Sequence, residues 1–384
     1  MTITGRKFEC SRDGLTIRGT EYRPEGENLP IVIVSHGFMD SQKGVNRYAQ
    51  QFARWGYAAY CFDFCGGCIR GTSDGATTDM TVFTEKEDLK SVISYVKSLP
   101  HVDSSRLILM GCSQGGFVSA LTAAEMQEQV EKLILFYPAL CIPDDARRGQ
   151  MMMAKFDTEN IPETIKCGPF RMGRDYPACV LSVDPFAEIS PYRGPVLIVH
   201  GTKDNIVAPH YAENAQKAYN DAVNYCDLAM IEGAGHGFRG RADKLAMDMV
   251  SQFVQGRRNV LTVDVKLTGH KLEKKGAYST LTLPFTGNAV GNWFQGEIQP
   301  GAADVQKRYL WKTVHFCADY VIKGKDHTGA SCQVHVVNED TGSGWKPTVT
   351  TDSEALSFLN GADCTAILEN RKQGPVVRIY CSII

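Results

Sequence analysis

The sequence has no large excess of either charge and no apolar run long enough to cross a membrane. Lysine plus arginine number 41 against 43 aspartates plus glutamates, which gives a formal charge of −2 at pH 7. This balance provides no general attraction for phosphate backbones or anionic lipid. Residues 1–14 lack the apolar stretch of roughly 7 to 15 residues that a secretory signal needs, and no later run approaches about 18 residues. We therefore expect a cytoplasmic protein without nucleic-acid or membrane partners.

Regular cysteine spacing, internal repeats and low-complexity tracts are absent as well. The 13 cysteines are scattered, and their number is odd. We expect reduced thiols, many of them small core residues, rather than a disulfide framework. The Cys65-Gly66-Gly67-Cys68 segment resembles half of a zinc site, but no matching second pair of ligands stands out. We expect loop cysteines there, with a redox or metal role as the alternative, and we predict no metal site and no cofactor.

The composition and the length indicate a folded chain of two domains. The 384 residues are 43% hydrophobic and 22% charged, which is close to the usual globular mixture. Up to about residue 256, short runs rich in valine and isoleucine alternate with longer amphipathic stretches, which is typical of βαβ units with helices on both faces of a parallel sheet. We expect strands at 31–35, 57–63, 106–110, 132–136, 196–200 and 227–231, and helices at 85–97, 208–222 and 242–254.

Two later segments depart from this rhythm. Residues 138–195 contain many prolines and no clear period, which is typical of a functional lid; a packed surface excursion is the alternative. After residue 256, short alternating segments punctuated by glycine, asparagine and threonine indicate an all-β region. We therefore predict an α/β catalytic domain at 1–256 with a lid insertion at about 138–195, and a smaller all-β, barrel-like domain at 257–384.

A Gly-X-Ser-X-Gly pattern centres on Ser113. Gly111 and Gly115 flank this serine at a distance of two residues, directly after an expected strand and before an expected helix. That context is typical of a nucleophile elbow, in which a sharp turn lifts the hydroxyl above the sheet edge. The start of the helix also favours developing negative charge. An ordinary glycine-rich helix cap is the alternative.

An acid and a base follow this serine in the order that the α/β-hydrolase arrangement requires. Asp204 comes just after the expected strand 196–200, and His236 lies between glycines after the strand 227–231. We predict that His236 is the general base for Ser113 and that Asp204 orients the imidazole. The alternative is a turn aspartate and a loop histidine without chemical roles. His200, within a strand, and His210, within a helix, are weaker candidates for the base.

An acyl-transfer site also needs donors for the oxyanion of the tetrahedral intermediate. The backbone N–H of Gln114, directly after the serine, is the first candidate. The second is the N–H of Phe38 in the segment Ser35-His36-Gly37-Phe38, where Gly37 permits a tight turn. We expect His36 to be a structural hydrogen bonder rather than a second base.

Residues 1–256 resemble the serine-dependent α/β hydrolases and, more narrowly, the bacterial cinnamoyl or feruloyl esterases. The elbow is common to all α/β hydrolases, whereas the likeness of the lid segment narrows the family. The resemblance implies that the lid closes over an aromatic acyl group and that Asp145 and Tyr176 contact its phenolic hydroxyls. Solvated loop residues are the alternative for both. The segments that carry the resemblance are 35–38, 111–116, 156–162, 195–201 and 231–236.

Two segments differ from that family. After Phe62-Asp63-Phe64, where relatives carry a short Gly-His-Gly turn, this chain has the longer and more basic segment from Cys65 to Gly71, which leaves the preferred alcohol or acyl group open. Residues 294–304 are similar to a small β-barrel family of uncharacterised function. We expect residues 257–384 to be a packing module or to form a homodimer, with a ligand-binding or second catalytic role as the alternative. The aromatic residues in question, which are typical of a core but would also suit a pocket, are Trp293, Phe294, Trp311 and Trp345.

The combined reading is a carboxylic ester hydrolase that acts on small aromatic, hydroxycinnamoyl-type esters through an acyl-enzyme and without a cofactor. The residues establish acyl transfer as the expected chemistry, and the resemblance implies the substrate class. A serine peptidase and an aliphatic acyl-ester hydrolase are the enzymatic alternatives. The non-enzymatic alternative is a ligand-binding protein on a hydrolase scaffold.

Overall fold

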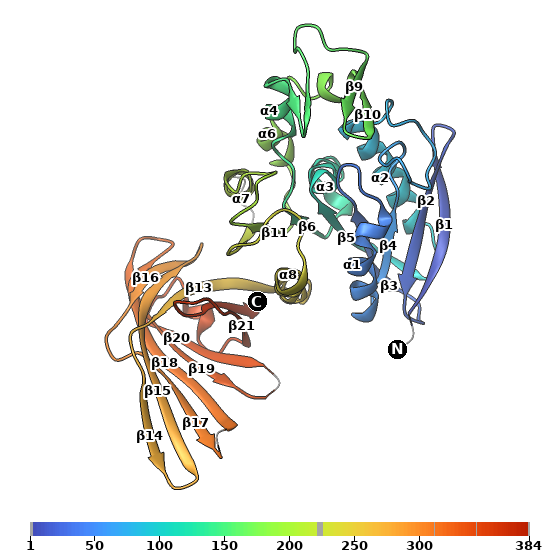
Figure 1. Ribbon diagram of the computed structural model, residues 1–384. Coiled ribbons are helices and arrows are strands. Elements are labelled where there is room, and N and C mark those ends of the chain that lie inside the picture. Colours follow the sequence, from blue (N-terminus) through green and yellow to red (C-terminus); the bar gives the residue numbers. More distant parts are fainter. Residues whose placement is uncertain (1–2, 221–225, 311, 343, 383–384) are drawn as a thin grey trace. The chain divides into compact units, whose positions relative to one another are not determined.

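The chain folds into two compact units, Met1–Asp243 and Lys244–Ile384. The computed structural model describes residues 3–220, 226–310, 312–342 and 344–382 (Figure 1). The division between the units falls within helix α8 (Gly240–Val254), shortly before the all-β sequence begins. Within the described ranges, no helix is both long and apolar enough to span a bilayer.

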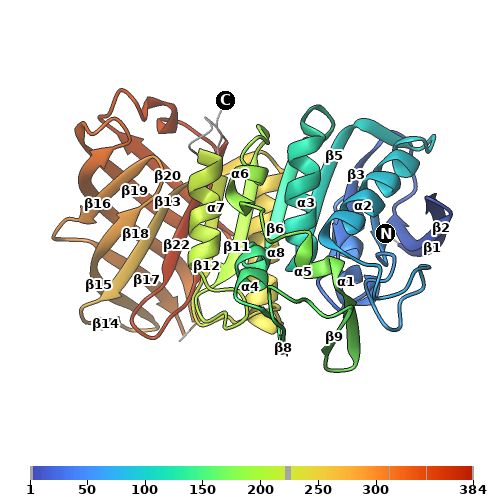
Figure 2. The same ribbon diagram turned by 90° about the horizontal axis from the view of Figure 1, so that it is seen from above.

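The first unit is built on an eight-stranded sheet in the order β1-β2-β4-β3-β5-β6-β11-β12. From β4 to β12 all neighbours run parallel, as the alternating pattern predicts. The antiparallel pair β1 and β2 extends one edge, and its charged outer strand explains why it lacks an apolar strand signature. Figure 2 shows the central strands side by side. The strands are β1 (Thr4–Arg12), β2 (Leu15–Arg23), β3 (Leu29–Ser35), β4 (Ala58–Phe62), β5 (Val102–Cys112), β6 (Lys132–Phe136), β11 (Val196–Gly201) and β12 (Cys226–Ile231).

Helices cover both faces of this sheet. Alternate residues of a strand point to opposite faces, so Ile31 and Ile33 of β3 join the core cluster that contains α2, while Val32 and Val34 face the other way. Figure 1 shows α1 on the opposite face from α2 and α3. Besides α8, the helices outside the lid are α1 (Gln42–Arg54), α2 (Val82–Lys97), α3 (Gln114–Glu125) and α7 (His210–Asn220); a short 3₁₀ turn spans Gln127–Gln129.

The expected helix boundaries shift where capping decides them. Helix α2 begins before residue 85 because Thr81 forms a capping box: its side chain accepts a hydrogen bond from the Thr84 amide, and the Thr84 side chain accepts one from the Thr81 amide. The helix expected at 208–222 is observed as α7, and its last two positions, 221 and 222, lie outside the described residues.

The lid segment consists of short elements rather than one irregular loop. They are too short to produce a period in the sequence, yet they bury Met151, Phe170 and Tyr176 in the core of the first unit. The elements are α4 (Ile142–Arg147), the hairpin of β7 (Gln150–Met151) with β8 (Ala154–Lys155), the hairpin of β9 (Thr164–Cys167) with β10 (Phe170–Gly173), α5 (Asp175–Ala178) and α6 (Pro185–Ile189).

After the remainder of α8, the second unit is a β-barrel. Its sheet closes because β13 pairs antiparallel with β22 on one side and with β15 on the other. The predicted barrel-like domain is thus confirmed; Trp311 lies outside the described residues. The strands are β13 (Arg257–Leu267), β14 (Lys271–Lys275), β15 (Tyr278–Val290), β16 (Phe294–Ile298), β17 (Ala303–Tyr309), β18 (Lys312–Asp326), β19 (Ser331–Asp340), β20 (Trp345–Thr351), β21 (Cys364–Glu369) and β22 (Val376–Ser382), with a 3₁₀ turn at Ser357–Leu359.

One disulfide corrects the expectation of reduced thiols at two of the cysteines. Cys364 of β21 and Cys381 of β22 are bonded, and their Cα atoms are 4.2 Å apart. The two residues face each other directly across the antiparallel pair, a register that their separation of 17 residues does not reveal. Cys65 and Cys68 are free thiols, the first buried and the second half-buried.

Candidate active site

Ser113 occupies a strained turn between β5 and α3. Its backbone has φ 55° and ψ −121°, a region that side chains larger than glycine rarely adopt. The flanking glycines are needed for steric reasons. A Cβ atom on Gly111 would lie 2.1 Å from the Gly115 carbonyl oxygen, and one on Gly115 would lie 2.2 Å from the His36 carbonyl oxygen. The turn therefore folds only with glycine at both positions.

The structure brings the three residues of the predicted triad together. His236 Nε2 lies 3.0 Å from Ser113 Oγ, and His236 Nδ1 lies 2.8 Å from Asp204 Oδ2. Asp204 follows β11 and His236 follows β12, and these neighbouring strands run parallel. Their loops therefore meet at the carboxyl edge of the sheet, which is where β5 ends, directly before Ser113.

The Asp204 carboxylate is held in its ionised form. Burial opposes ionisation, but hydrogen bonds from His236 and from the Val207 and Ile206 amides keep the pKa of Asp204 below its ordinary value. Both amides donate to Oδ1 at 2.9 Å, which leaves Oδ2 for the imidazole. This arrangement fixes the ring with its Nδ1 proton toward Asp204 and its Nε2 lone pair toward Ser113.

Two other histidines near the sheet edge have structural contacts. Burial lowers the pKa of His36, whose Nδ1 donates to the Gly37 carbonyl at 2.8 Å and whose Nε2 accepts from the Phe64 amide at 3.2 Å. Burial also lowers the pKa of His200, whose Nε2 lies 2.9 Å from the Val207 carbonyl oxygen. Both rings are thus neutral groups that stabilise nearby loops through hydrogen bonds to their backbone.

The amides of Phe38 and Gln114 are available as donors. Within the part of the chain that the structure describes, neither N–H donates to a backbone acceptor. Both residues line the same cavity as Ser113. A Cβ atom on Gly37 would lie 3.0 Å from Ser113 Cβ, so the loop that carries Phe38 approaches the serine as closely as a bare backbone allows.

Ser113 and Phe38 line two cavities of the first unit. The smaller one has a volume of about 350 Å³ and an apolar wall that includes Ile142, Val207 and three consecutive methionines from Met151 to Met153. The larger one has a volume of about 670 Å³ and is more polar, with Arg47, Asp40 and Asp243 in its wall. The serine hydroxyl therefore has an apolar space on one side and a charged space on the other.

Asp145 and Tyr176 both line the smaller cavity, as the resemblance implies. The Tyr176 hydroxyl donates to the side-chain oxygen of Gln114, and its ring centroid lies 5.5 Å from that of Phe38. The Asp145 carboxylate is ion-paired with Arg148. Because the Tyr176 hydroxyl proton is donated to Gln114, the Tyr176 oxygen can only accept a hydrogen bond from a bound molecule.

Sequence reasoning missed a buried acid behind Gln114. Glu85 is 1% exposed, and its Oε2 accepts a hydrogen bond of 2.8 Å from Gln114 Nε2. Burial raises the pKa of Glu85 well above its ordinary value. The signal was its spacing: Glu85 stands at helical intervals from the apolar Leu89, Val92 and Val96, which places a carboxyl group on the buried face of α2.

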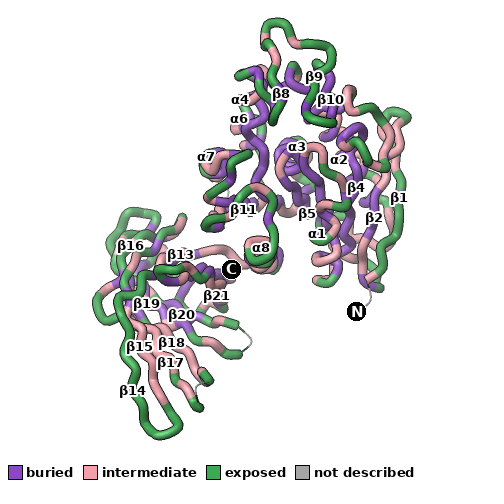
Figure 3. Tube along the Cα trace, in the orientation of Figure 1, coloured by how far each residue is buried: buried purple, intermediate pink, exposed green. Residues whose placement is uncertain are grey.

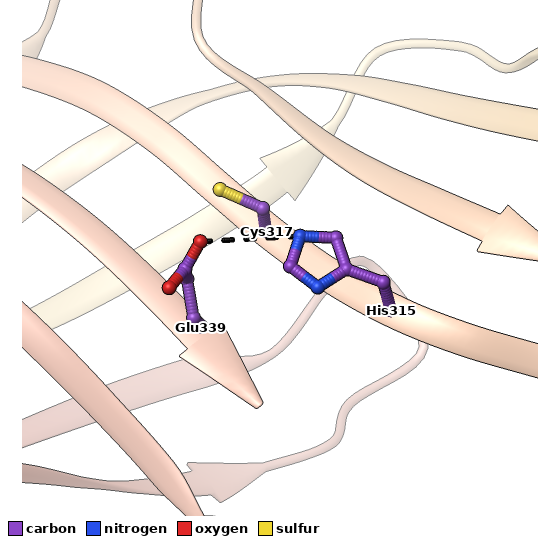
Figure 4. A group of neighbouring side chains, drawn as sticks. All are labelled: His315, Cys317 and Glu339. Atoms are coloured by element: carbon purple, nitrogen blue, oxygen red, sulfur yellow. Dashed lines mark ion pairs between the residues drawn. The ribbon is translucent and has the colours of Figure 1, made fainter. Parts of the chain in front are cut away.

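A group of possible metal ligands lies in the second unit. His315 and Cys317 of β18 and Glu339 of β19 each offer an atom, and these atoms lie within 4.8 Å of one another (Figure 4). The set matches the donors that zinc accepts. His315 and Cys317 are half-buried and Glu339 is exposed, so the group is open to solvent. Among the described residues it is the one such group, and it was not predicted from the sequence.

Comparison with known proteins finds similar sequences and folds. Residues 26–166 match the family model described as serine aminopeptidase, S33. The solved structure of Est1E from Butyrivibrio proteoclasticus with ferulic acid bound is similar at 26% identity and a TM-score of 0.59, and the match covers 65% of this chain and 98% of that one. The first unit has the α/β-hydrolase fold.

Two curated relatives match parts of the chain. The quorum-quenching protein AidA of Acinetobacter baumannii is 31% identical over 106 residues, which is 27% of this chain and 34% of that protein. The monoglyceride lipase of Rattus norvegicus is 29% identical over 147 residues, which is 37% of this chain and 46% of the lipase. The chain thus spans only a third to a half of the length of these relatives.

Proposed function

We propose that this protein is a serine carboxylic ester hydrolase that acts on small aromatic, hydroxycinnamoyl-type esters. The observation that supports the proposal most strongly is the hydrogen-bonded chain from Asp204 through His236 to Ser113, at the wall of an apolar cavity. The similarity to Est1E, which was solved with ferulic acid bound, supports the aromatic acyl group.

The proposed reaction begins when Ser113 Oγ attacks the ester carbonyl carbon while His236 Nε2 takes the hydroxyl proton. The Phe38 and Gln114 amides then donate to the oxyanion of the tetrahedral intermediate. As the carbon–oxygen bond to the alcohol breaks, His236 returns the proton to the departing alkoxide. Water, deprotonated by the same imidazole, attacks the acyl-enzyme and releases the acid and the free serine.

The two cavities suit the two parts of such a substrate. The smaller cavity, at about 350 Å³, is of the size and apolar character that an aromatic acyl group needs. Asp145 and Tyr176 are the proposed contacts for its ring hydroxyls, with the Tyr176 oxygen as acceptor. The larger and more polar cavity would receive the alcohol, which can therefore carry polar groups.

A peptidase is the second candidate, since the matching family model is named for an aminopeptidase. An aminopeptidase needs a carboxylate that is free to hold the substrate's ammonium group. Asp145 is the one carboxylate in the lining of the smaller cavity, and it is already paired with Arg148. This pairing favours the ester over the aminoacyl amide.

The test is a substrate panel of methyl ferulate, p-nitrophenyl butyrate and leucine p-nitroanilide, assayed with the full chain. We expect the highest kcat/KM on methyl ferulate and a loss of about 10,000-fold or more in Ser113→Ala. Ser94→Ala, an exposed serine on α2, is the matched control and should keep full activity. A higher kcat/KM on the butyrate would indicate an aliphatic ester hydrolase, and a higher kcat/KM on the anilide would indicate a peptidase. Full activity in Ser113→Ala would overturn the proposal altogether.

A further inference from the structure

The second unit contains a cavity, lined by the barrel strands and by α8, that the proposed ester hydrolysis does not use. Its volume is about 800 Å³, within the range of small-molecule sites. Closed barrels can hold a small ligand in their interior. In Figure 3 the strands β15, β17 and β18 are mostly of intermediate burial, unlike the buried central strands of the first unit. The interior of this barrel is therefore only partly filled by its own side chains.

The register of the strands places a small residue between two polar ones inside the barrel. Ala318 of β18 lies directly opposite Asp304 of β17 on one side and Asn338 of β19 on the other. All three line the cavity. Because neighbouring strands are about 4.8 Å apart, the alanine leaves a space roughly two strands wide between the two polar side chains.

Aromatic rings bound this space along β18. Phe316 and Tyr320 stand two residues before and after Ala318, so they project to the same side of the sheet. The Phe316 ring contacts Trp345 at 5.7 Å between centroids, and the Tyr320 ring contacts Phe285 at 5.4 Å. All four aromatic residues line the cavity. The cavity therefore has flat apolar walls on both sides of Ala318 along the strand direction.

Three polar atoms at this place have no partner among the described residues. They are Asp304 Oδ1, Tyr320 Oη and Asn338 Oδ1. Tyr320 and Asn338 are 4% and 2% exposed, and a buried polar atom without a hydrogen bond is costly in free energy. The other oxygen of Asp304 accepts from Gln306 Nε2 at 2.8 Å, which fixes the orientation of the carboxyl group. The unpartnered atoms are two acceptors and one hydroxyl.

We propose that the barrel is a binding site for an uncharged aromatic molecule that carries hydroxyl groups. Ring walls select a flat apolar body, and the carbonyl and carboxyl oxygens of Asn338 and Asp304 select a hydrogen-bond donor. Lys244 and Asp248 of α8 also line the cavity but are ion-paired with each other at 3.0 Å. Asp304 is the acidic group that the strands contribute, so a carboxylate bound beside it would meet a like charge. The proposal does not depend on the chemistry at Ser113.

The experiment measures binding of three matched probes to full-length Ser113→Ala protein by equilibrium dialysis at neutral pH. The probes are 2-naphthol, 2-methoxynaphthalene, which cannot donate a hydrogen bond, and 2-naphthoate, which is charged. We expect 2-naphthol to bind about 10-fold more tightly than either of the others, since each hydrogen bond contributes a factor of roughly 2 to 10. Equal affinity for the three probes, or no binding of 2-naphthol, would overturn the proposal.

Two variants locate the binding in the barrel rather than in the hydrolase unit. Ala318→Trp fills the space and should abolish 2-naphthol binding, whereas Asp319→Trp, at the exposed neighbouring position, should leave it unchanged. Tyr320→Phe removes one oxygen without changing the shape. It should weaken 2-naphthol binding about 3- to 10-fold. Tyr278→Phe, at an exposed tyrosine, is the matched control.

Circular dichroism of each variant shows whether the barrel is folded. If Ala318→Trp does not fold, Tyr320→Phe still decides the test. The site is wrongly placed if folded Ala318→Trp binds 2-naphthol as the parent does, or if Tyr320→Phe and Tyr278→Phe behave alike. Binding of 2-naphthol that these variants do not change belongs to the hydrolase unit and overturns the inference without affecting the proposed esterase activity.

Discussion

The two units provide a site in opposite ways. In the hydrolase unit, the central strands are packed solid and the candidate site lies in loops at their carboxyl ends, where Ser113 is held at a positive φ. In the barrel unit, the cavity is lined by α8 and by the inward faces of strands that include β15, β17, β18 and β19. Strain and precise contacts define the first site, whereas incomplete packing defines the second.

This difference indicates which changes each site tolerates. Catalysis at Ser113 depends on the positions of single atoms, so small displacements cost large factors in rate. A binding cavity depends on the sum of many wall contacts and a few hydrogen bonds, so single changes alter affinity by smaller factors. Variants of the hydrolase unit should therefore lose activity steeply and leave 2-naphthol binding in the barrel intact.

The largest of these effects is expected for Asp204→Asn. The Ile206 and Val207 amides donate to Oδ1, so they will hold the asparagine oxygen and turn its NH₂ group toward His236 Nδ1. The imidazole must then carry its proton on Nε2, where it cannot accept the proton of Ser113. We expect kcat/KM for methyl ferulate to fall about 1,000- to 10,000-fold.

Asp79→Asn, at an exposed aspartate, is the control for that change and should keep the parent rate. Barrel binding of 2-naphthol, measured in the same preparations, should not differ between the two variants. If Asp204→Asn kept more than a tenth of the activity, the hydrogen-bonded chain would not be the catalytic one.

A smaller effect is expected for Gly37→Ala. The added methyl group would stand 3.0 Å from Ser113 Cβ and 3.5 Å from its Oγ, so either the serine or the loop that carries Phe38 must shift by a few tenths of an ångström. We expect a loss of about 10- to 100-fold in kcat with little change in the melting temperature. In Gly71→Ala the nearest atom would be 3.4 Å away, and this control should retain its activity. Equal rates for the two variants would show that the loop that carries Phe38 can shift without any loss of activity.

The convergence of three residues at one sheet edge could be predicted from the sequence, for a physical reason. Catalytic loops follow strands, so Ser113, Asp204 and His236 could be placed by their order along the chain and by the valine-rich strands before them. The fold class followed from the same alternation. The partners of Gln114 could not be predicted, because Glu85 and Tyr176 reach it from a helix and from the lid, and no local pattern encodes such long-range contacts.

The cavity of the barrel could hardly be predicted from the sequence. Its polar residues, Asp304 and Asn338, look like ordinary strand residues until the register places them on either side of Ala318. The Cys364–Cys381 disulfide was missed for the same reason, since cross-strand register cannot be derived from spacing. The one usable signal was the aromatic content, and of those residues Trp345 lines the cavity while Phe294 belongs to the core.

The smallest effect concerns the buried acids of the two units. Burial raises the pKa of Glu85, so above the ordinary glutamate pKa of about 4.3 the folded state keeps a proton that the unfolded state releases. The free energy of unfolding then falls as the pH rises, by at most about 1.4 kcal/mol per pH unit for this group. The glutamine of Glu85→Gln does not titrate, so this variant should flatten the slope between about pH 5 and 8. The measurement is urea unfolding, monitored by the helix signal in circular dichroism.

Glu87→Gln, on the exposed side of α2, is the control and should keep the parent slope. An equal slope in Glu85→Gln would mean that water reaches the acid in the folded protein. Burial also raises the pKa of Asp304, but that carboxyl lines a cavity and is half-buried, so Asp304→Asn should change the slope less than Glu85→Gln does.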